Sequence, residues 1–310
     1  MDLQGALLAW SAAGRRDLPW RHTRDPWAVV VSEVMLQQTQ VARVVPRYAA
    51  FLEQFPTPAA CAAAPPADVV RSWAGLGYNH RAVSLRRLAT AVVERHDGRL
   101  PGDLASLLAL PGVGPYTARA VLAFAFEADV GVVDVNAARV LARTAGHPLR
   151  AADVQARADA LVPQGCGWVW NQAMLDLGAT VCTKRAPRCG DCPVAAWCAW
   201  RTAAGVAGEP HRADPAVGSA GTGGRQSAFA GSDRQGRGRL VDALRLGPVA
   251  WDAVAAAAGW PGDDERARRV AATLVADGLA DDDGASLRLP GAPPGGPPAS
   301  SPTGTCRAAR

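Results

Sequence analysis

Apolar positions in residues 1–202 recur at helical spacing, and glycine or proline stands at nearly every junction between the periodic segments. Strand signals are few here, so one helical domain is expected over this range. The helices predicted within it span Leu3–Ala13, Trp27–Gln37, Val41–Gln54, Ala67–Trp73, Arg81–His96, Leu104–Leu110, Pro115–Phe126, Val135–Ala145, Val154–Val162 and Trp168–Leu177.

Two of these helices meet at a glycine-rich turn that carries boundary signals on both sides. Asp103 is the expected N-cap of helix Leu104–Leu110, and a Pro-Gly pair ending at Gly112 stops that helix. Gly112 and Gly114 permit backbone conformations closed to other residues, and Pro115 suits the first position of the next helix. The pattern predicts a helix-hairpin-helix whose free amides can bind an anion such as a phosphate. An ordinary helix–helix turn is the alternative.

The composition changes after the helical domain. Residues 203–228 are rich in Ala, Gly, Pro and Ser, which is typical of a flexible linker. Periodicity returns in residues 229–290, where the expected elements are Leu240–Arg245, Val249–Ala258, Asp264–Asp277 and a short strand at Ser286–Leu289. Three helices and a terminal hairpin predict a small winged-helix-like domain, and the Pro/Gly/Ser-rich tail, residues 291–310, is predicted to be disordered.

The basic charge of the chain is supplied almost entirely by arginine, because Lys184 is the single lysine. The net charge of +5 permits a polyanionic partner without requiring one. The N-terminus lacks the basic flank of a secretory signal, and no apolar run approaches membrane-spanning length. A cytoplasmic protein with reduced thiols and no membrane partner is therefore expected.

Four cysteines follow one another closely near the end of the helical domain, with the spacing C-x6-C-x2-C-x5-C. They are Cys182, Cys189, Cys192 and Cys198. Thiolates are ligands of both zinc and iron–sulfur centres, and the spacing alone leaves both open. Three cations lie between the first two cysteines: Lys184, Arg185 and Arg188. A metal-fixed loop with these cations suits a phosphate backbone, and a solvated charge run is the alternative.

Further motifs stand in a fixed order over roughly residues 15 to 200. They are Leu18-Pro-Trp-Arg21, Ser32-Glu-Val-Met-Leu-Gln-Gln-Thr-Gln-Val41, Gly75-Leu-Gly-Tyr78, Leu110-Pro-Gly-Val-Gly-Pro-Tyr-Thr117, Val133-Asp-Val-Asn136, Asn171-Gln172 and the cysteine loop. This set resembles the helix-hairpin-helix DNA glycosylases of the endonuclease III superfamily, and within it the MutY-type adenine DNA glycosylases. The resemblance implies a [4Fe–4S] cluster on the four cysteines and, as substrate, duplex DNA with adenine opposite 8-oxoguanine or guanine.

The resemblance also implies catalysis by two carboxylates. Glu33 lies in an apolar helix that starts at Asp25 and Pro26, and such surroundings raise a carboxyl pKa and suit a general acid. Asp134 begins a helix whose N-terminus favours the ionised form, which suits stabilisation of the sugar oxocarbenium ion. By the resemblance, Glu33 protonates N7 of adenine and then activates water, and Asn136 positions groups at the site.

Five more residues match positions that contact DNA in the family. By the resemblance, Trp20, Arg21 and Gln172 hold the extruded adenine, while Gln38 and Tyr78 enter the duplex. For Trp20 and Tyr78 taken singly, packing in the core is the alternative.

Tyr116 indicates which kind of glycosylase this is. Bifunctional relatives carry a lysine in the hairpin helix, which forms a Schiff base with the sugar; this chain has Tyr116 there and its single lysine in the cysteine loop. A monofunctional hydrolase is therefore predicted.

The C-terminal region departs from the family pattern. Residues 203–310 do not resemble the Nudix-like domain with which typical MutY proteins read 8-oxoguanine, so discrimination is expected to rest mostly on the first domain. A DNA-binding role and a packing or partner role both stay open for the winged-helix-like domain.

The whole sequence thus predicts a mainly α protein with an iron–sulfur loop, acting in base excision repair as a monomer in the cytoplasm, at the nucleoid. Two other functions remain open: a mismatch thymine DNA glycosylase of the same superfamily, and a non-catalytic DNA-binding iron–sulfur regulator.

Overall fold

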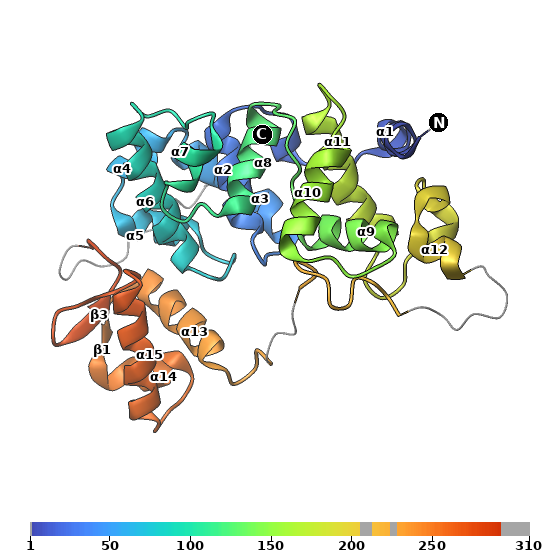
Figure 1. The fold of residues 1–310 in the computed structure, drawn as a ribbon. Helices are drawn as coiled ribbons and strands as arrows, with labels where there is room; N and C mark the ends of the chain where they lie inside the picture. The colour runs from blue at the N-terminus through green and yellow to red at the C-terminus, as the bar shows by residue number, and fades with distance from the viewer. Residues whose placement is uncertain (1, 205–212, 224–227, 293–310) are drawn as a thin grey trace, which may run out of the picture. The chain divides into compact units, whose positions relative to one another are not determined.

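The structure, a computed structural model, describes residues 2–204, 213–223 and 228–292 (Figure 1). The fold is mainly helical, as the sequence predicts. The chain divides into two compact units: one comprises Met1–Ala59 and Leu88–Gln226, the other Ala60–Arg87 and Ser227–Arg310. Residues 60–87, which the sequence places in the first domain, thus group with the C-terminal part.

The first unit is built from helices that share a continuous apolar core. Its elements are α1 (Leu3–Gly14), η1 (Pro19–Arg21), α2 (Pro26–Leu36), α3 (Val41–Gln54), α7 (Leu104–Leu108), α8 (Pro115–Ala125), α9 (Val135–Ala145), α10 (Ala151–Leu161), α11 (Gly167–Asp176), η2 (Leu177–Val181), η3 (Cys189–Asp191), η4 (Ala195–Trp197) and α12 (Ala199–Ala204). One core cluster joins α1, α9, α10 and α11, with Leu7, Leu141 and Trp170 fully enclosed. Figure 1 shows α9, α10 and α11 side by side.

Helix α2 is the most deeply buried element of this unit. The Asp25 carboxylate caps it, accepting from the amides of Trp27 (3.1 Å) and Ala28 (3.4 Å), and Pro26 occupies its first turn. Every residue from Trp27 to Met35 is buried, between α3 and α8. A helix that is apolar on all sides belongs inside a protein, and its one acidic residue is therefore enclosed as well.

The helix-hairpin-helix is confirmed at α7 and α8. Asp103 accepts from the amide of Ser106 (2.8 Å), and Gly114 stands at the N-cap of α8 with Pro115 behind it. Gly112 has a φ of +76°, a left-handed conformation that a residue with a Cβ rarely adopts. Gly112 and Gly114 are both exposed, so the turn faces solvent.

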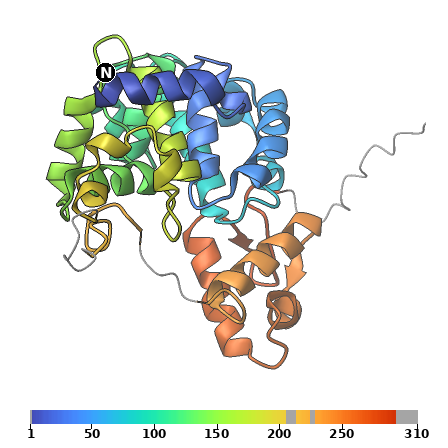
Figure 2. The ribbon, with the colours of Figure 1, turned by 90° about the vertical axis from the view of Figure 1, so that its right-hand side faces the viewer.

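The second unit combines the C-terminal elements with part of the N-terminal chain. Its elements are the end of α4 (Pro58–Ala63), α5 (Pro66–Ser72), the first half of α6 (His80–Arg95), α13 (Asp233–Leu246), β1 (Val249–Ala250), η5 (Trp251–Ala253), α14 (Val254–Ala258), α15 (Asp264–Ala276), β2 (Asp281–Asp282) and β3 (Ser286–Arg288). The antiparallel sheet has the order β1-β3-β2, with Val249 opposite Leu287. Figure 2 shows α13, α14 and α15, in orange and red, packed together. Three helices and a hairpin follow in the predicted order; the two-residue β1 was not anticipated.

The predicted flexible linker is wrong for residues 213–223. Ser219 accepts from the amide of Leu149 (2.9 Å), the amide of Ala220 donates to the Leu149 carbonyl (2.9 Å), and Ala216 is buried. Asp214 pairs with the buried Arg143. These contacts, made by two polar side chains among small residues, fix the segment on the first unit. Residues 203 and 204 of the expected linker belong to α12 (Ala199–Ala204). Residues 205–212 and 224–227 of the linker, and residues 293–310 of the expected disordered tail, lie outside the described residues.

Within the described ranges, the helices are too short or too polar to cross a bilayer.

Candidate active site

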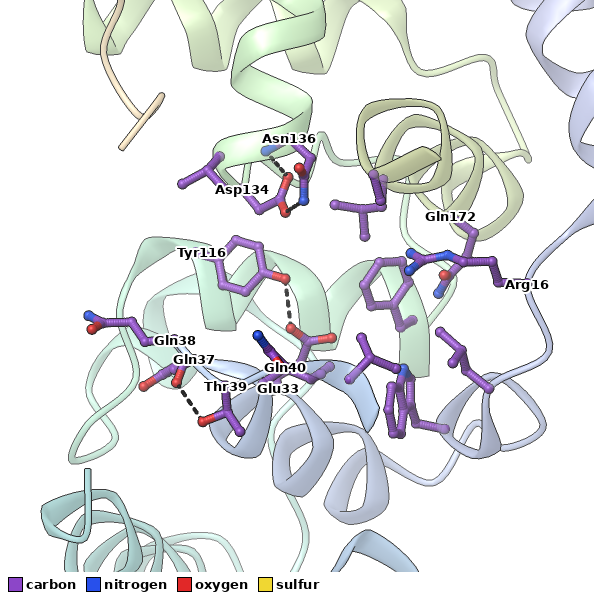
Figure 3. A pocket seen from close by; sticks show the side chains of 18 of the residues that line it. Arg16, Glu33, Gln37, Gln38, Thr39, Gln40, Tyr116, Asp134, Asn136 and Gln172 are labelled. Carbon is purple, nitrogen blue, oxygen red and sulfur yellow. Dashed lines mark hydrogen bonds between the residues drawn. The ribbon is translucent and has the colours of Figure 1, made fainter. Parts of the chain in front are cut away.

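A cavity of about 800 Å³ opens in the first unit between α2, α8, α9 and α11 (Figure 3). Eight residues that the sequence singles out line it together: Trp20, Arg21, Glu33, Gln38, Tyr116, Asp134, Asn136 and Gln172. These residues come from positions up to 152 apart in the chain, so the fold assembles the predicted site from separate elements.

Glu33 is the buried acid of this cavity. Its residue is 4% exposed, and burial raises the pKa of its carboxyl to about 7. Tyr116 Oη donates to Glu33 Oε2 (2.7 Å) and opposes that rise, while the nearby Asp134 charge adds to it. Near neutral pH both the protonated and the ionised form of this carboxyl are therefore accessible, so it can act as an acid and as a base.

Asp134 lies on the other side of Tyr116 from Glu33 (Figure 3). It caps α9, accepting from the amides of Asn136 (2.8 Å) and Ala137 (2.7 Å), and Asn136 Nδ2 donates to its second oxygen (2.7 Å). The sequence predicts that this helix N-terminus favours ionisation. The structure corrects the net direction: burial outweighs these donors, so the pKa of Asp134 is raised.

Asn136 is itself held by a residue that the sequence did not single out. Arg139 Nη2 donates to Asn136 Oδ1 (2.9 Å) and to the Gly178 carbonyl (2.6 Å), and Arg139 Nε donates to the Cys182 carbonyl (2.7 Å). One buried guanidinium thus connects the N-terminus of α9 with the start of the cysteine loop.

The residues predicted to hold the base are fixed by packing and by a buried ion pair. Arg21 makes two hydrogen bonds of 2.8 Å to Asp176, with side chains 4% and 3% exposed. Trp20 packs edge-on against Tyr48 at 5.6 Å between ring centroids, and Gln172 is buried in α11. Trp20 is thus a core residue that also forms part of the cavity wall.

Two residues predicted to enter the duplex have strained backbones. Gln38 has a φ of +55° and Tyr78 a φ of +45°, in the left-handed region that non-glycine residues seldom occupy. Gln38 is exposed and lines the cavity. Tyr78 does not line it and belongs to the second unit. The predicted phosphate-binding glycines, Gly112 and Gly114, also lie outside the cavity lining, in the exposed hairpin.

The four cysteines surround a second, narrow cavity of about 20 Å³ together with Arg143 and Arg188. Arg143 Nη1 donates to Cys182 Sγ (3.3 Å), and burial raises the pKa of Cys192 to about 11, with the other three thiols adding to the rise. Among the described residues, no three His, Cys, Asp or Glu side chains are arranged as they stand to hold a metal ion. The donor set of four clustered thiols nevertheless has the chemistry that a thiolate-ligated centre requires.

Sequence reasoning missed four residues that complete these sites, and the first is Arg139, which holds Asn136. Asp176 is the partner of Arg21, Arg143 is the buried cation of the cysteine loop, and Gly221 lines the cavity from the segment expected to be a linker. Arg143 and Asp176 are charged residues within apolar helices, which is a usable signal for buried pairing. Gly221 carried no such signal.

Comparison with known proteins bears on what this site does. The model of the HhH-GPD superfamily base excision DNA repair proteins matches residues 31–164. The adenine DNA glycosylase of Mycolicibacterium smegmatis is 42% identical over 278 residues, which is 88% of this chain and 90% of that protein. The adenine DNA glycosylase of Mycobacterium tuberculosis is 43% identical over 88% of each chain. The human adenine DNA glycosylase is 42% identical over 63% of this chain and 38% of its own length.

Solved structures agree at the level of the fold. A thermostable thymine-DNA glycosylase superposes with a TM-score of 0.61 at 30% identity, covering 64% of this chain and 95% of that one. Endonuclease III trapped covalently on DNA gives a TM-score of 0.56 at 23% identity, covering 63% and 92%, a likeness of fold alone. The matches to the mycobacterial adenine DNA glycosylases extend over 88% of the chain. The chain belongs to the adenine DNA glycosylases of the HhH-GPD superfamily and is an adenine-specific glycosylase of base excision repair.

Proposed function

We propose that the chain hydrolyses the N-glycosidic bond of adenine paired with 8-oxoguanine or guanine in duplex DNA, without cutting the strand. The observation that carries this is the buried Glu33, with a pKa of about 7, facing Asp134 across Tyr116 in one cavity. Two carboxyl groups in different surroundings are what glycosidic cleavage needs, one to protonate the leaving group and one to stabilise the sugar cation.

Glu33 is the proposed general acid. In its protonated form it donates to N7 of the extruded adenine; once ionised, it accepts a proton from the attacking water. Tyr116 holds the carboxyl in place through the 2.7 Å hydrogen bond. Because the amides of α9 already orient Asp134, its carboxylate is ready to face the oxocarbenium ion without rearrangement.

The cavity wall supplies the proposed adenine contacts. Trp20 offers an apolar face, Gln172 an amide, and Arg21 a guanidinium fixed by Asp176. A base must leave the helical stack to reach Glu33, and a cavity of about 800 Å³ has room for it. Gln38 and Tyr78 are proposed to enter the duplex, where their strained conformations serve as preformed wedges.

Two exposed elements are proposed to hold the phosphate backbone. Gly112 and Gly114 are exposed in the hairpin, and Lys184, Arg185 and Arg188 are exposed in the cysteine loop. The proposed cofactor is a [4Fe–4S] cluster on Cys182, Cys189, Cys192 and Cys198, which would cross-link that loop when bound. The proposed state in the cell is a cytoplasmic monomer at the nucleoid.

The experiment compares three duplexes, with adenine opposite 8-oxoguanine, adenine opposite guanine and thymine opposite guanine. We expect adenine release from the first two and a loss of about 10²- to 10⁴-fold in Glu33→Gln, with duplex binding retained. The exposed Glu94→Gln is the matched control and keeps wild-type rates. Adenine release by Glu33→Gln at the wild-type rate contradicts the proposal, and thymine release in its place supports the mismatch thymine glycosylase.

A further inference from the structure

The loop that carries Tyr78 has an unusual backbone. Gly75 has a φ of +84°, Gly77 of +70° and Tyr78 of +45°, so three of four consecutive residues are left-handed. A tyrosine in this region is unfavourable on its own and persists only where the surroundings hold it. The contacts around the loop therefore decide where the Tyr78 ring lies.

One set of contacts comes from the flanking chain. Arg81, whose residue is 3% exposed, donates to the carbonyls of Leu76 (3.2 Å), Gly77 (3.0 Å) and Tyr78 (3.3 Å). Trp73 Nε1 donates to the Gly77 carbonyl as well (3.2 Å). Trp73 and Arg81, on either side of the loop, thus hold its backbone carbonyls in place.

A second set comes from helix α13 of the same unit. Arg245 Nη2 donates to Asn79 Oδ1 (2.8 Å), and Arg245 Nε donates to the Val70 carbonyl (3.2 Å). Arg234 Nη1 lies 3.4 Å from Tyr78 Oη and donates to it. Positions 234 and 245 are close to three helical turns apart, so one face of α13 presents both guanidinium groups to the loop.

The rest of the C-terminal chain strengthens this contact. The amide of Ala67 donates to the Pro290 carbonyl (3.0 Å), and the chain after α15 meets α6, where Gly278 packs near Arg87 and Val83. The Arg245 side chain is only 10% exposed. Its guanidinium thus faces the protein and is poorly placed to bind a DNA phosphate.

Other arginines of this region also serve contacts within the unit. Arg266 pairs with Asp233 (2.8 Å) and lies over the Trp260 ring (4.0 Å), and Arg237 pairs with Asp277. A DNA-reading winged helix would direct such cations outward. These pairings within the unit favour a packing role for Arg237 and Arg266.

We propose that α13 is a support for the Tyr78 loop, with Arg234 and Arg245 as positioning residues for the entry of Tyr78 into the mispaired duplex. This rests on the proposed function, in which Tyr78 contacts DNA. The C-terminal unit then contributes to recognition of the mispair through the wedge that it holds.

A double-mutant cycle tests the proposal in the full-length protein. Adenine release from duplex with adenine opposite 8-oxoguanine is measured at subsaturating duplex for Arg245→Met, alone and combined with Tyr78→Ala. We expect Arg245→Met alone to lower the apparent second-order rate about tenfold, and to lower it less than about twofold when Tyr78→Ala is already present. The loss is expected only in the background that retains Tyr78, because the Tyr78→Ala background lacks the ring that Arg245 positions.

Two further variants keep the result interpretable. Asn79→Ala removes the acceptor of the same hydrogen bond and is expected to reproduce the loss if Arg245→Met does not fold. Arg268→Met, in the same unit but exposed and lying over the Trp251 ring, is the matched control and keeps the wild-type rate within about twofold.

The experiment distinguishes a failure of the proposed function from a failure of this inference. A wild-type protein that releases no adenine from any duplex overturns the proposed function and this inference with it. If the wild type is active and both Arg245→Met and Asn79→Ala release adenine at the wild-type rate, the inference alone is overturned. Equal losses in the native and Tyr78→Ala backgrounds overturn it too, since they indicate a general effect on the fold.

Discussion

Glu33 is a carboxyl group in a place where its charge is unfavourable. Eight buried neighbours in α2 shield it from water, and the Tyr116 hydroxyl offsets only part of the loss of hydration. The same burial that raises its pKa to about 7 makes it useful as an acid near neutral pH and lowers the stability of the fold.

This leads to a prediction for stability against pH. Below pH 4.5, Glu33 is protonated in both the folded and unfolded states, so its burial has no electrostatic effect on unfolding. Between pH 4.5 and about 7 the unfolded state loses its proton first, and the folded state becomes less stable by about 3 kcal/mol in all. Glu33→Gln is therefore expected to be more stable than wild type by up to that amount at pH 8, with the difference vanishing near pH 4.

Urea unfolding of both proteins at pH 4 and pH 8 measures this difference. The exposed Glu94→Gln controls for the change of side chain. If the free energies of unfolding of wild type and Glu33→Gln differ by the same amount at both pH values, the raised pKa assigned to the buried Glu33 is contradicted.

At the scale of elements, the N-terminus of α9 is the part of the site with the least freedom. Asp134, Asn136 and Arg139 are joined by hydrogen bonds, and the π-helical turn Leu177–Val181 packs directly on them. The contact depends on Gly178: a Cβ there would lie 2.7 Å from Asn136 Cβ and 2.8 Å from the Asn136 carbonyl oxygen.

Gly178→Ala is accordingly expected to displace Asn136, and with it Asp134. We expect a loss of stability of about 1–3 kcal/mol, as for other overpacked sites, and slower adenine release at saturating duplex. Thermal unfolding and single-turnover kinetics check the two effects. Gly14→Ala is the control, because a Cβ at Gly14 meets no atom within 4 Å; similar behaviour of the two variants contradicts the role given to this contact.

The sequence could predict elements whose signals are local. Asp103, Pro115 and the turn glycines define the hairpin, and Asp25 with Pro26 marks the start of α2, so both were placed correctly. The raised pKa of Glu33 followed from its apolar helix. The net shift of Asp134 did not, because it depends on how much of the folded chain covers the cap, which local sequence does not encode.

Partners distant in the chain also escaped prediction. The pairing of Asp176 with Arg21 joins residues 155 apart, and Gly221 reaches the cavity from an Ala/Gly-rich stretch whose composition suggests only flexibility. Asp214 and Ser219 anchor that stretch on the first unit through partners far from it in sequence, Arg143 and Leu149.

At the scale of the molecule, the division into units does not follow the order of the chain. Ala60–Arg87, from the middle of the glycosylase sequence, packs with the last third of the protein. The matches to the mycobacterial enzymes cover 88% of this chain and so must reach into this C-terminal region. This chain therefore shares at least part of its C-terminal region with those enzymes.

The distribution of amines over the whole chain gives the final prediction. Among the residues lining the catalytic cavity there is no lysine, and Lys184 lies in the cysteine loop. Borohydride treatment during turnover is expected to trap no protein–DNA adduct above background, because no lysine amine can reach the sugar. Tyr116→Lys, which places an amine beside Glu33, is the control expected to yield an adduct; efficient trapping by wild type contradicts the monofunctional mechanism.

The same solitary lysine has a practical consequence. Lys184 is exposed, between Cys182 and Cys189, on the loop proposed to face the phosphate backbone. Apart from the α-amino group of the chain, an amine-reactive fluorophore has a single group to modify, the Lys184 side chain at that edge of the protein. A dye on Lys184 would sense the approach of DNA through quenching or a change in anisotropy, and no residue would have to be engineered in or out.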